Sequence, residues 1–340
     1  MIREKTDFDL TRFNTFRLPM MAARFVEYDD TADLATLFGS GAFASPWLHL
    51  GGGSNLLFAT ARYEGLVLHR AYRGDNPLTG LREGDEPQLV VAPAAIDLDQ
   101  LAEMTAQMGL YGLENLSGIP GQLGAGVVQN VGAYGVELGQ IVDSVETFDT
   151  QNGTVGWISA DDCAFGYRTS AFKNGGPLQG RCIVTAVKLR LSRSASPVLT
   201  YGSLAALAPD ASPMTVREAV LDIRRSKLPD VEAYGSAGSY FKNPVVDASA
   251  YARACSMSGL EIPSHTTADG RHKLSAAWLI DKSGLKGTTE GGAALWPTQP
   301  LVIYNRDNAT ATDVLRLQHH IVDTVLNRFG IELHPEVQRI

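Results

Sequence analysis

Two glycine-rich segments are the parts of the sequence best suited to hold a ligand against the backbone. The first is GGGSN at residues 51–55, directly after the predicted strand Trp47–Leu50. Three successive glycines let backbone N–H groups approach a ligand closely, and such a concave run of donors suits a phosphate group. The segment lacks the spacing of a GxGxxG dinucleotide turn and of a GxxxxGK[ST] phosphate loop. A flexible hairpin without a ligand is the alternative interpretation.

The second segment runs from residue 112 to residue 139 and contains GLENLSGIPG at 112–121 and GAYG at 132–135. A proline between glycines fixes a sharp turn, and spaced glycines leave room for a flat ligand against the backbone. Because both segments flank predicted α/β units, together they predict a bound dinucleotide. A glycine-rich packing corner without a ligand is the alternative.

Short strands and helices are predicted to position these segments. Apolar runs bounded by turn residues predict four further strands at Leu66–His69, Gln88–Pro93, Arg181–Leu191 and Leu301–Asn305. Asp97–Met108 is predicted to be a helix, since Leu98, Leu101 and Met104 fall on one face. Residues 112–139 hold too many glycines for a regular element.

A second α/β segment is predicted to begin at Lys227, and Ser192–Pro197 is predicted to be a boundary or an exposed loop. The last predicted helix has Thr312 as its N-cap and Gly330 as its C-terminal stop. Its apolar face is made by Val314, Leu317, Ile321, Val325 and Phe329.

Composition excludes several classes of protein. The chain of 340 residues predicts two or three domains, and 44% hydrophobic residues suffice for several cores. A formal charge of −8 disfavours nucleic-acid binding, although local Arg and Lys residues could hold an anionic substrate.

We find no signal peptide and no apolar run near the roughly 20 residues that span a bilayer. Widely spaced Cys163, Cys182 and Cys255 predict reduced thiols in a cytoplasmic protein, and no His pattern predicts a metal site.

At the glycine-rich segments the sequence resembles the UDP-N-acetylenolpyruvoylglucosamine reductases (the MurB family, type I). These belong to the flavoprotein superfamily of vanillyl-alcohol oxidase and p-cresol methylhydroxylase. The resemblance runs from Asn14 to Val337 and implies FAD, bound without a covalent bond because Ser54 and Asn55 stand where covalent relatives carry a His. The flavin contacts that it implies are Gly51, Gly52, Gly53, Ser54, Asn55, Ile119, Pro120, Gly121 and Gly132.

Three further motifs match the family's catalytic set: YRTS at 167–170, GSYFKNP at 238–244 and PEV at 335–337. They imply catalytic roles for Arg168, Ser239 and Glu336. Tyr201, Lys227 and Asn243 match positions that contact substrate, the last two at its diphosphate. The chain departs from the family at residue 338, where many relatives carry Arg or Lys and this chain has Gln, and residues 122–126 match only loosely.

The implied substrate is a vinyl ether conjugated to a carboxylate. Hydride from reduced flavin would add to its methylene carbon and leave an enolate-like dianion, which a permanently charged guanidinium such as Arg168 would stabilise. Ser239 would then protonate the neighbouring carbon. Glu336 would have to be protonated, or neutralised by a nearby cation, before it could help. The alternatives are a surface ion pair for Arg168, a turn residue for Ser239 and a solvated acid for Glu336.

The implied fold is α+β: a two-part FAD-binding α/β module plus a C-terminal α/β substrate-binding domain. We expect the module's first part at 1–76, joined by 330–340, its second part at 77–226, and the substrate domain at 227–329. NADPH would be the reductant and would take turns with the nucleotide sugar in a monomeric protein with no metal. An oxidase of the same flavin fold and a module that only binds nucleotide sugar are the rival functions.

Overall fold

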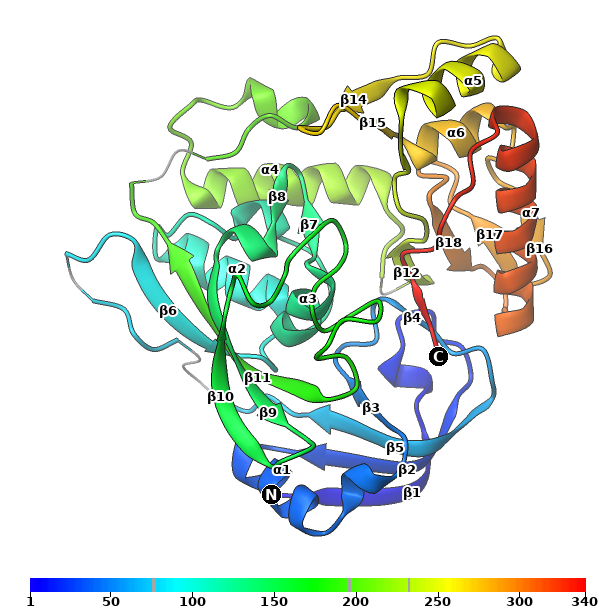
Figure 1. The fold of residues 1–340 in the computed structure, drawn as a ribbon. Coiled ribbons are helices and arrows are strands. Elements are labelled where there is room, and N and C mark those ends of the chain that lie inside the picture. Colours follow the sequence, from blue (N-terminus) through cyan, green and yellow to red (C-terminus); the bar gives the residue numbers. More distant parts are fainter. Residues whose placement is uncertain (75–77, 83, 195–196, 232) are drawn as a thin grey trace. The chain divides into compact units, whose positions relative to one another are not determined.

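The computed structural model describes residues 1–74, 78–82, 84–194, 197–231 and 233–340. These residues form two compact units, which can be followed along the chain in Figure 1. Unit 1 contains Met1–Phe8, Met21–Gly52 and Arg62–Ser226, and unit 2 contains Asp9–Met20, Gly53–Ala61 and Lys227–Ile340. Unit 2 therefore takes its residues from three separated stretches of sequence.

The first sheet of unit 1 has the strand order β1-β2-β5-β3. Its strands are β1 (Arg3–Asp9), β2 (Met21–Tyr28), β5 (Arg62–Arg70) and β3 (Trp47–Leu50). Both β2 and β3 pair with β5 in parallel, and the connection from β2 passes through helix α1 (Thr31–Gly39). The predicted strands at 47–50 and 66–69 are confirmed, the second as part of the longer β5.

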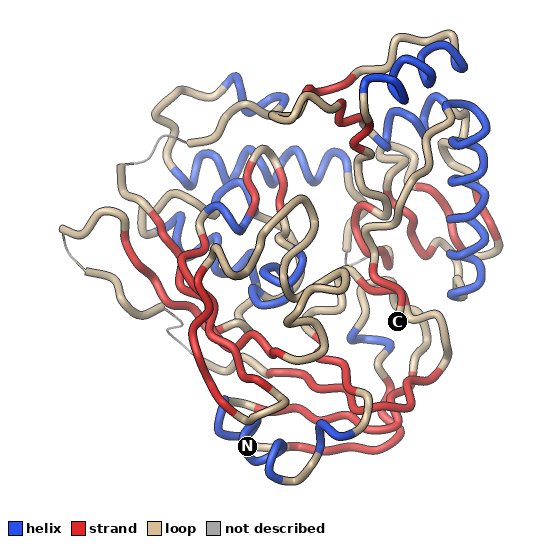
Figure 2. The backbone as a smooth tube through the Cα atoms, in the orientation of Figure 1, coloured by secondary structure: helices blue, strands red, loops and turns tan. Residues whose placement is uncertain are grey.

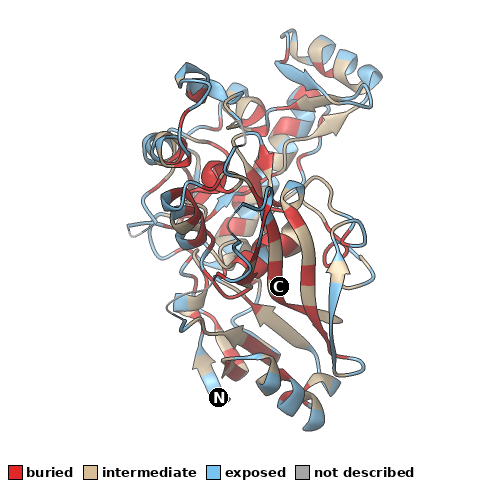
Figure 3. Ribbon diagram, turned by 90° about the vertical axis from the view of Figure 1, so that its left-hand side faces the viewer, coloured by how far each residue is buried: buried red, intermediate tan, exposed pale blue. Residues whose placement is uncertain are grey.

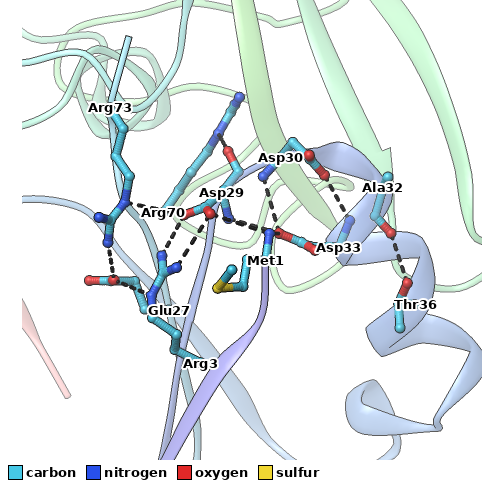
Figure 4. A network of polar contacts seen from close by, with 10 residues as sticks. All are labelled: Met1, Arg3, Glu27, Asp29, Asp30, Ala32, Asp33, Thr36, Arg70 and Arg73. Atoms are coloured by element: carbon cyan, nitrogen blue, oxygen red, sulfur yellow. Dashed lines mark hydrogen bonds and ion pairs between the residues drawn. The ribbon is translucent and has the colours of Figure 1, made fainter.

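A network of ion pairs joins the start of β1 to the end of β2, as Figure 4 shows. Arg3 pairs with Glu27 and Asp29, and Arg73 reaches the same two carboxylates. Hydrogen bonds from Arg3 lower the pKa of Asp29 to about 2. These pairs lie at the surface, so each contributes little alone, but charges shared between several partners form a connected network.

The second sheet of unit 1 is antiparallel and has the order β10-β9-β11-β6. Its strands are β10 (Thr154–Ser159), β9 (Val142–Asp149), β11 (Cys182–Leu191) and β6 (Gln88–Pro93). Figure 2 shows the strands in red on the backbone tube. Alternate residues such as Val145, Val187 and Val90 are fully buried beneath this sheet. The predicted strand at 88–93 is confirmed, and the strand predicted at 181–191 begins one residue later.

Helices α2 (Leu98–Gln107), α3 (Leu123–Gln129) and α4 (Pro213–Lys227) join this second sheet in unit 1, α4 reaching the first residue of unit 2. The predicted helix at 97–108 is confirmed, with Asp97 as its N-cap and Met108 as its C-cap. The absence of a regular element in 112–139 was a wrong prediction, because α3 lies there. Its glycines permit close packing: a Cβ on Gly124 would lie 2.8 Å from the Cβ of Ala94.

The main sheet of unit 2 is antiparallel and has the order β12-β18-β17-β16. Its strands are β12 (Gly235–Ser239), β18 (Val302–Asn305), β17 (Ala293–Leu295) and β16 (Thr289–Glu290). The shorter strands of unit 2 are β4 (Leu56–Leu57), β13 (Val245–Val246), β14 (Ser264–Thr266), β15 (His272–Leu274) and β19 (Gln338–Arg339). Unit 1 also contains one short pair of strands, β7 (Gly132–Ala133) and β8 (Val136–Glu137). The strand predicted at 301–305 is confirmed from residue 302.

Helices α5 (Ala248–Ser258), α6 (Ala276–Lys282) and α7 (Ala311–Phe329) complete unit 2. The five predicted apolar residues of α7 are all buried, and Gly330 is the C-cap, with a left-handed backbone conformation. Figure 3 colours the buried residues of the protein red. Thr312 as N-cap was wrong. Thr310 caps the helix instead, because its side chain accepts a hydrogen bond from the N–H of Asp313, whose carboxylate bonds the N–H of Thr310 in return.

The division between the units falls between Ser226 and Lys227, where the second α/β segment was predicted to begin. The predicted boundary at 76–77 and part of the predicted loop at 192–197 lie outside the described residues, and the three-part division stays a prediction. Cys163, Cys182 and Cys255 form no disulfide, and burial raises the pKa of the Cys163 thiol to about 12. No helix in the described part of the chain is long and apolar enough to cross a membrane.

Candidate active site

The two glycine-rich segments meet in unit 1. A Cβ on Gly52 would lie 2.7 Å from the Cα of Gly121, and one on Gly51 would lie 2.9 Å from the Cβ of Ala125. Backbone therefore passes directly against backbone, and any side chain at these glycines would force the segments apart. The Gly121 carbonyl accepts a hydrogen bond from the N–H of Leu98, the first residue of α2, which fixes the turn.

These observations fit a dinucleotide. Because glycine has no side chain, the backbone N–H groups of these turns are accessible to phosphate oxygens. Gly53 is the last glycine of the run and belongs to unit 2, where it has a φ of 62° and its missing Cβ would lie 2.0 Å from the Phe13 carbonyl oxygen. Both units therefore contain residues of the GGGSN segment.

Arg168 lies in a tight turn of unit 1. Gly166 and Thr169 exchange two backbone hydrogen bonds of 3.0 and 3.1 Å across that turn, and Arg168 has a left-handed φ of 57°. Its Nη2 donates to the Gly132 carbonyl at 2.5 Å. A left-handed conformation is uncommon for a residue with a side chain, and such strain gathers at functional sites. The predicted flavin contact Gly132 and the predicted catalytic Arg168 are thus in direct contact.

Tyr201 lies over the same glycine-rich segment. The residue is 45% exposed, and its ring meets the ring of Tyr134 edge to face, with centroids 5.1 Å apart. Burial raises the pKa of Tyr134, so its phenol stays protonated. An exposed aromatic ring resting on a second aromatic ring is suited to cover a bound ligand.

Ser239 stands at an irregularity of strand β12 in unit 2. The pairing of β12 with β18 shifts between Ser236 and Ser239, and Gly238 takes a left-handed φ of 69°. A bulge of this kind re-aims the next side chain. The Ser239 residue is exposed, so its hydroxyl is accessible.

Glu336 is joined to the residue that follows Ser239. Its N–H donates to the Tyr240 carbonyl at 2.8 Å, and Phe241 pairs with Pro335 in an isolated antiparallel bridge. The Glu336 carbonyl in turn accepts a hydrogen bond from the side-chain amide of Asn55 at 3.2 Å. Unit 2 therefore brings three distant predicted residues together: Asn55, Ser239 and Glu336.

The tail that carries Glu336 is fixed by a parallel ladder. Gln338 lies opposite Leu56 and Arg339 opposite Leu57, so β19 extends β4 directly after the GGGSN segment. The Gln338 N–H donates to the Asn55 carbonyl at 2.9 Å. At residue 338 the backbone therefore makes this contact whatever the side chain, which explains how Gln can stand there without loss of the ladder.

Lys227 and Asn243, the remaining predicted substrate residues, both lie in unit 2. Lys227 is exposed, and its carbonyl accepts a hydrogen bond from the Thr298 hydroxyl at 2.9 Å. The Asn243 side-chain oxygen accepts from the N–H of Ala276 at 3.0 Å, where α6 begins. Asn243 therefore helps to hold α6, a role that the sequence did not predict.

Asn115 was missed by the sequence analysis, although it lies within the glycine-rich segment. Its side chain is completely buried, and its amide nitrogen donates at 2.8 Å to each of two carbonyls, those of Tyr134 and Val198. It therefore joins the segment that contacts Arg168 to the segment that leads into Tyr201. A polar residue between the apolar Leu113 and Leu116 was the available signal.

Comparison with known proteins shows the family of the chain. The family model for the C-terminal domain of UDP-N-acetylenolpyruvoylglucosamine reductase matches residues 230–340, and a model for an FAD binding domain matches residues 22–159. The chain is 42% identical to the UDP-N-acetylenolpyruvoylglucosamine reductase of Chromobacterium violaceum, over 98% of this chain and 97% of that protein. The chain belongs to the UDP-N-acetylenolpyruvoylglucosamine reductase family.

Other members of the reductase family are similarly close. The reductase of Neisseria gonorrhoeae is 41% identical, over 98% of this chain and 96% of that protein. The crystal structure of the reductase from Thermus caldophilus aligns with a TM-score of 0.69 at 24% identity, over 100% of this chain and 98% of that one. The reductase family and the α+β fold are therefore shown, and the chain is an oxidoreductase that uses FAD.

Proposed function

We propose that the chain reduces the enolpyruvyl group of UDP-N-acetylglucosamine enolpyruvate to give UDP-N-acetylmuramate, with NADPH as the source of electrons. Membership of the reductase family supports the reaction, which forms a precursor of peptidoglycan. The observation that carries the proposal is the contact in unit 2 between the Ser239–Tyr240 segment and Glu336. A proton donor and a second acidic group are what the reduction of a conjugated double bond requires.

FAD, when bound and reduced by NADPH, would supply the hydride that adds to the methylene carbon of the substrate. The chain's part in binding it is assigned to backbone donors of Gly51, Gly52 and Gly121 in unit 1 and of Gly53, Ser54 and Asn55 in unit 2. Ile119, Pro120 and Gly132 complete the proposed contacts. The close backbone approach of Gly52 to Gly121 supports this assignment.

Arg168 is proposed to stabilise the negative charge that the substrate carboxylate gains. A guanidinium stays charged and can give two donors to one carboxylate. The strained turn at Arg168 and its bond to the Gly132 carbonyl restrict the guanidinium before substrate arrives. A donor that is already oriented needs no rearrangement as charge develops, and removing one such donor typically costs about 10²–10³ in rate.

Ser239 is proposed to give the proton to the carbon next to the carboxylate. A hydroxyl is a weak acid, but an enolate carbon is strongly basic, so transfer is feasible when the two are held close. The bulge at Gly238 and the exposure of Ser239 support this role. Glu336, in its protonated form, would add a hydrogen bond to the same anion.

Tyr201, Lys227 and Asn243 are proposed to bind the nucleotide sugar. The exposed ring of Tyr201 would cover it, and the ammonium group of Lys227 would meet the diphosphate. Asn243 lies at the start of α6, where its side-chain oxygen accepts from the N–H of Ala276, and its amide nitrogen is proposed to donate to a phosphate oxygen.

Replacement of Ser239 by Ala separates the two half-reactions. We expect NADPH to bleach the flavin of Ser239→Ala at the normal rate, because that step needs no serine proton. Reoxidation by the enolpyruvyl substrate should slow by about 10²–10⁴-fold. Anaerobic stopped-flow absorbance measures both steps.

The matched control is Ser236→Ala, an identical change at a buried position of the same strand. It should leave both half-reactions intact. Equal loss of both steps in Ser239→Ala would mean that Ser239 serves structure or flavin binding. A protein that binds no flavin, or one whose reduced flavin reacts rapidly with oxygen and ignores the substrate, would contradict the proposed function.

A further inference from the structure

Helix α4 presents two arginines on one face in unit 1. Arg217 and Arg224 are seven residues apart, which is close to two helical turns. Both are directed to the start of the GIPG turn. Arg217 reaches Asp99, which holds the Gly118 N–H, and Arg224 lies against Gly118 itself. The two guanidinium groups have different partners.

The guanidinium group of Arg217 forms ion pairs with two carboxylates. Both of its terminal nitrogens contact Asp99 in the first turn of α2, and Glu103 lies 3.7 Å from it. The Asp99 carboxylate also accepts a hydrogen bond from the Gly118 N–H at 2.6 Å. Burial raises the pKa of Asp99, but Arg217 and this N–H outweigh the effect and lower it. The Asp99 carboxylate is therefore already committed.

Arg224 has no carboxylate within ion-pair distance in the described part of the chain. The Tyr134 phenol and, at longer range, Asp99 are the groups that act on its charge. Burial lowers the pKa of Arg224. A guanidinium that has lost much of its water without gaining an anion is costly, so this position favours an anion from outside the chain.

Gly118 gives Arg224 its access to the turn. A Cβ on Gly118 would lie 2.8 Å from the Arg224 Nε and 2.9 Å from the Leu221 Cδ2, and Gly118 has a left-handed φ of 71°. The guanidinium therefore lies against bare backbone directly before Ile119, Pro120 and Gly121. A flat fork of N–H donors beside a glycine turn is an arrangement that binds phosphate oxygens in pairs.

We propose that Arg224 binds the pyrophosphate of the bound dinucleotide at the turn formed by residues 118–121. The inference rests on the proposed function, because it takes residues 119–121 as flavin contacts. Arg224 supplies the positive charge for the pyrophosphate, and the glycine backbone supplies neutral donors. The nucleotide sugar also contains a pyrophosphate, so the test must separate the two sources.

The test compares Arg224→Met with Arg225→Met. Arg225 is the next residue of α4, is exposed, and pairs with Asp222, so this control makes the same change in net charge away from the turn. The yellow proteins are diluted, and release of FAD is followed by flavin fluorescence. We expect Arg224→Met to bind FAD about 10–100-fold more weakly, the usual effect of losing charge-assisted hydrogen bonds. Arg225→Met should match the wild type.

Exchange with riboflavin, which has no phosphate, gives the decisive comparison. Affinity for riboflavin should be equal in wild type and Arg224→Met, because only the pyrophosphate contact is lost. A variant that weakens FAD and riboflavin equally would overturn the proposal and indicate a general disturbance of the turn. Arg224→Lys keeps the charge but loses the paired N–H donors of the guanidinium, so it should bind FAD with intermediate affinity. The same variant replaces Arg224→Met in the comparison if Arg224→Met does not fold.

Binding of UDP to the FAD-loaded protein, followed by flavin absorbance, tests the other source. We expect equal UDP affinity in wild type and Arg224→Met. Weaker UDP binding with unchanged FAD release would assign Arg224 to the nucleotide sugar and overturn the flavin assignment. A wild-type protein without flavin would instead contradict the proposed function, so the two failures are distinguishable.

Discussion

Side-chain amides, rather than charges, hold the backbone around the candidate catalytic residues. Asn115 donates to the carbonyls on either side of the Tyr134–Tyr201 contact, and Asn130 donates to the Gly166 carbonyl at the base of the Arg168 turn. An amide fixes a carbonyl without adding a charge. Arg168 therefore remains the candidate residue that supplies positive charge to an anionic substrate.

Asn115→Asp tests whether the amide donors are what matters. The carboxylate has the same shape but no donor, so both carbonyls lose this partner. We expect the free energy of unfolding to fall by about 2–4 kcal/mol, since the loss of each hydrogen bond from the buried Asn115 side chain costs about 1–3 kcal/mol. Urea unfolding measures the loss, and amide hydrogen exchange should accelerate around residues 134 and 198.

The matched control is Asn152→Asp. Asn152 is exposed and uses only its side-chain oxygen, which accepts from the N–H and hydroxyl of Thr154. A carboxylate can replace that oxygen, so the change should stay within about 0.5 kcal/mol. Equal destabilisation by the two substitutions would show that the buried donors of Asn115 contribute nothing specific.

At the scale of elements, the chain places two turns so that their backbones touch. The turn after β3 and the turn before α3 meet at Gly52 and Gly121. Neither turn is a complete ligand site alone, because each supplies only a few donors. Their contact makes one continuous surface of backbone, and it exists only while both positions remain glycine.

Gly52→Ala should therefore reduce the flavin content of the protein. The new Cβ would lie 2.7 Å from the Gly121 Cα, which is backbone and cannot rotate away. Overpacking of this kind costs about 1–3 kcal/mol, so FAD affinity should fall by about tenfold or more. The ratio of flavin to protein absorbance after gel filtration measures the effect.

The control for this change is Gly39→Ala at the end of α1, where a Cβ would meet no atom within 4 Å. It should keep its flavin and fold at least as stably, because alanine is the better helix residue. Normal flavin content in Gly52→Ala would mean that the contact between the two turns is not needed for binding.

The same elements show which features the sequence could predict. Helix α7 and strand β6 follow from hydrophobic periodicity, because each buries one side against a core. Helix α3 does not follow, since glycine frequency alone argues against a helix. Only tertiary packing reveals that Gly124 needs to be small where it meets Ala94. Thr310 was missed because Thr312 has the same side chain, and the decisive partner is Asp313.

The candidate site was predictable as a set of residues but not as an arrangement. The motifs predicted Ser239 and Glu336 as site residues, yet nothing in their spacing predicts that an isolated bridge between Phe241 and Pro335 brings them together. Long-range pairing depends on the whole of unit 2. Asn115 was missed for a related reason: its partners lie 19 and 83 residues away.

At the scale of the whole molecule, stability should depend on pH through two groups that lose their protons at different pH. Arg3 holds the pKa of Asp29 at about 2, below its ordinary value, so that stabilisation is present above about pH 4 and is lost as pH falls toward 2. His49 on β3 acts at higher pH. It hydrogen-bonds the Tyr28 hydroxyl at 2.9 Å, and burial, with His69 and Arg70 nearby, lowers its pKa to about 3.

His49→Gln should therefore remove an acid-sensitive contribution to stability. In the folded state His49 stays neutral, whereas in the unfolded chain it takes up a proton below about pH 6.5. Its contribution is complete above that pH and is lost progressively as pH falls toward 3, by about 2 kcal/mol between pH 7 and pH 5. Glutamine does not titrate but can still bond the Tyr28 hydroxyl. Calorimetry should show a smaller fall of Tm from pH 7 to pH 5 in His49→Gln than in the wild type, and parallel falls would mean that His49 is protonated in the folded protein.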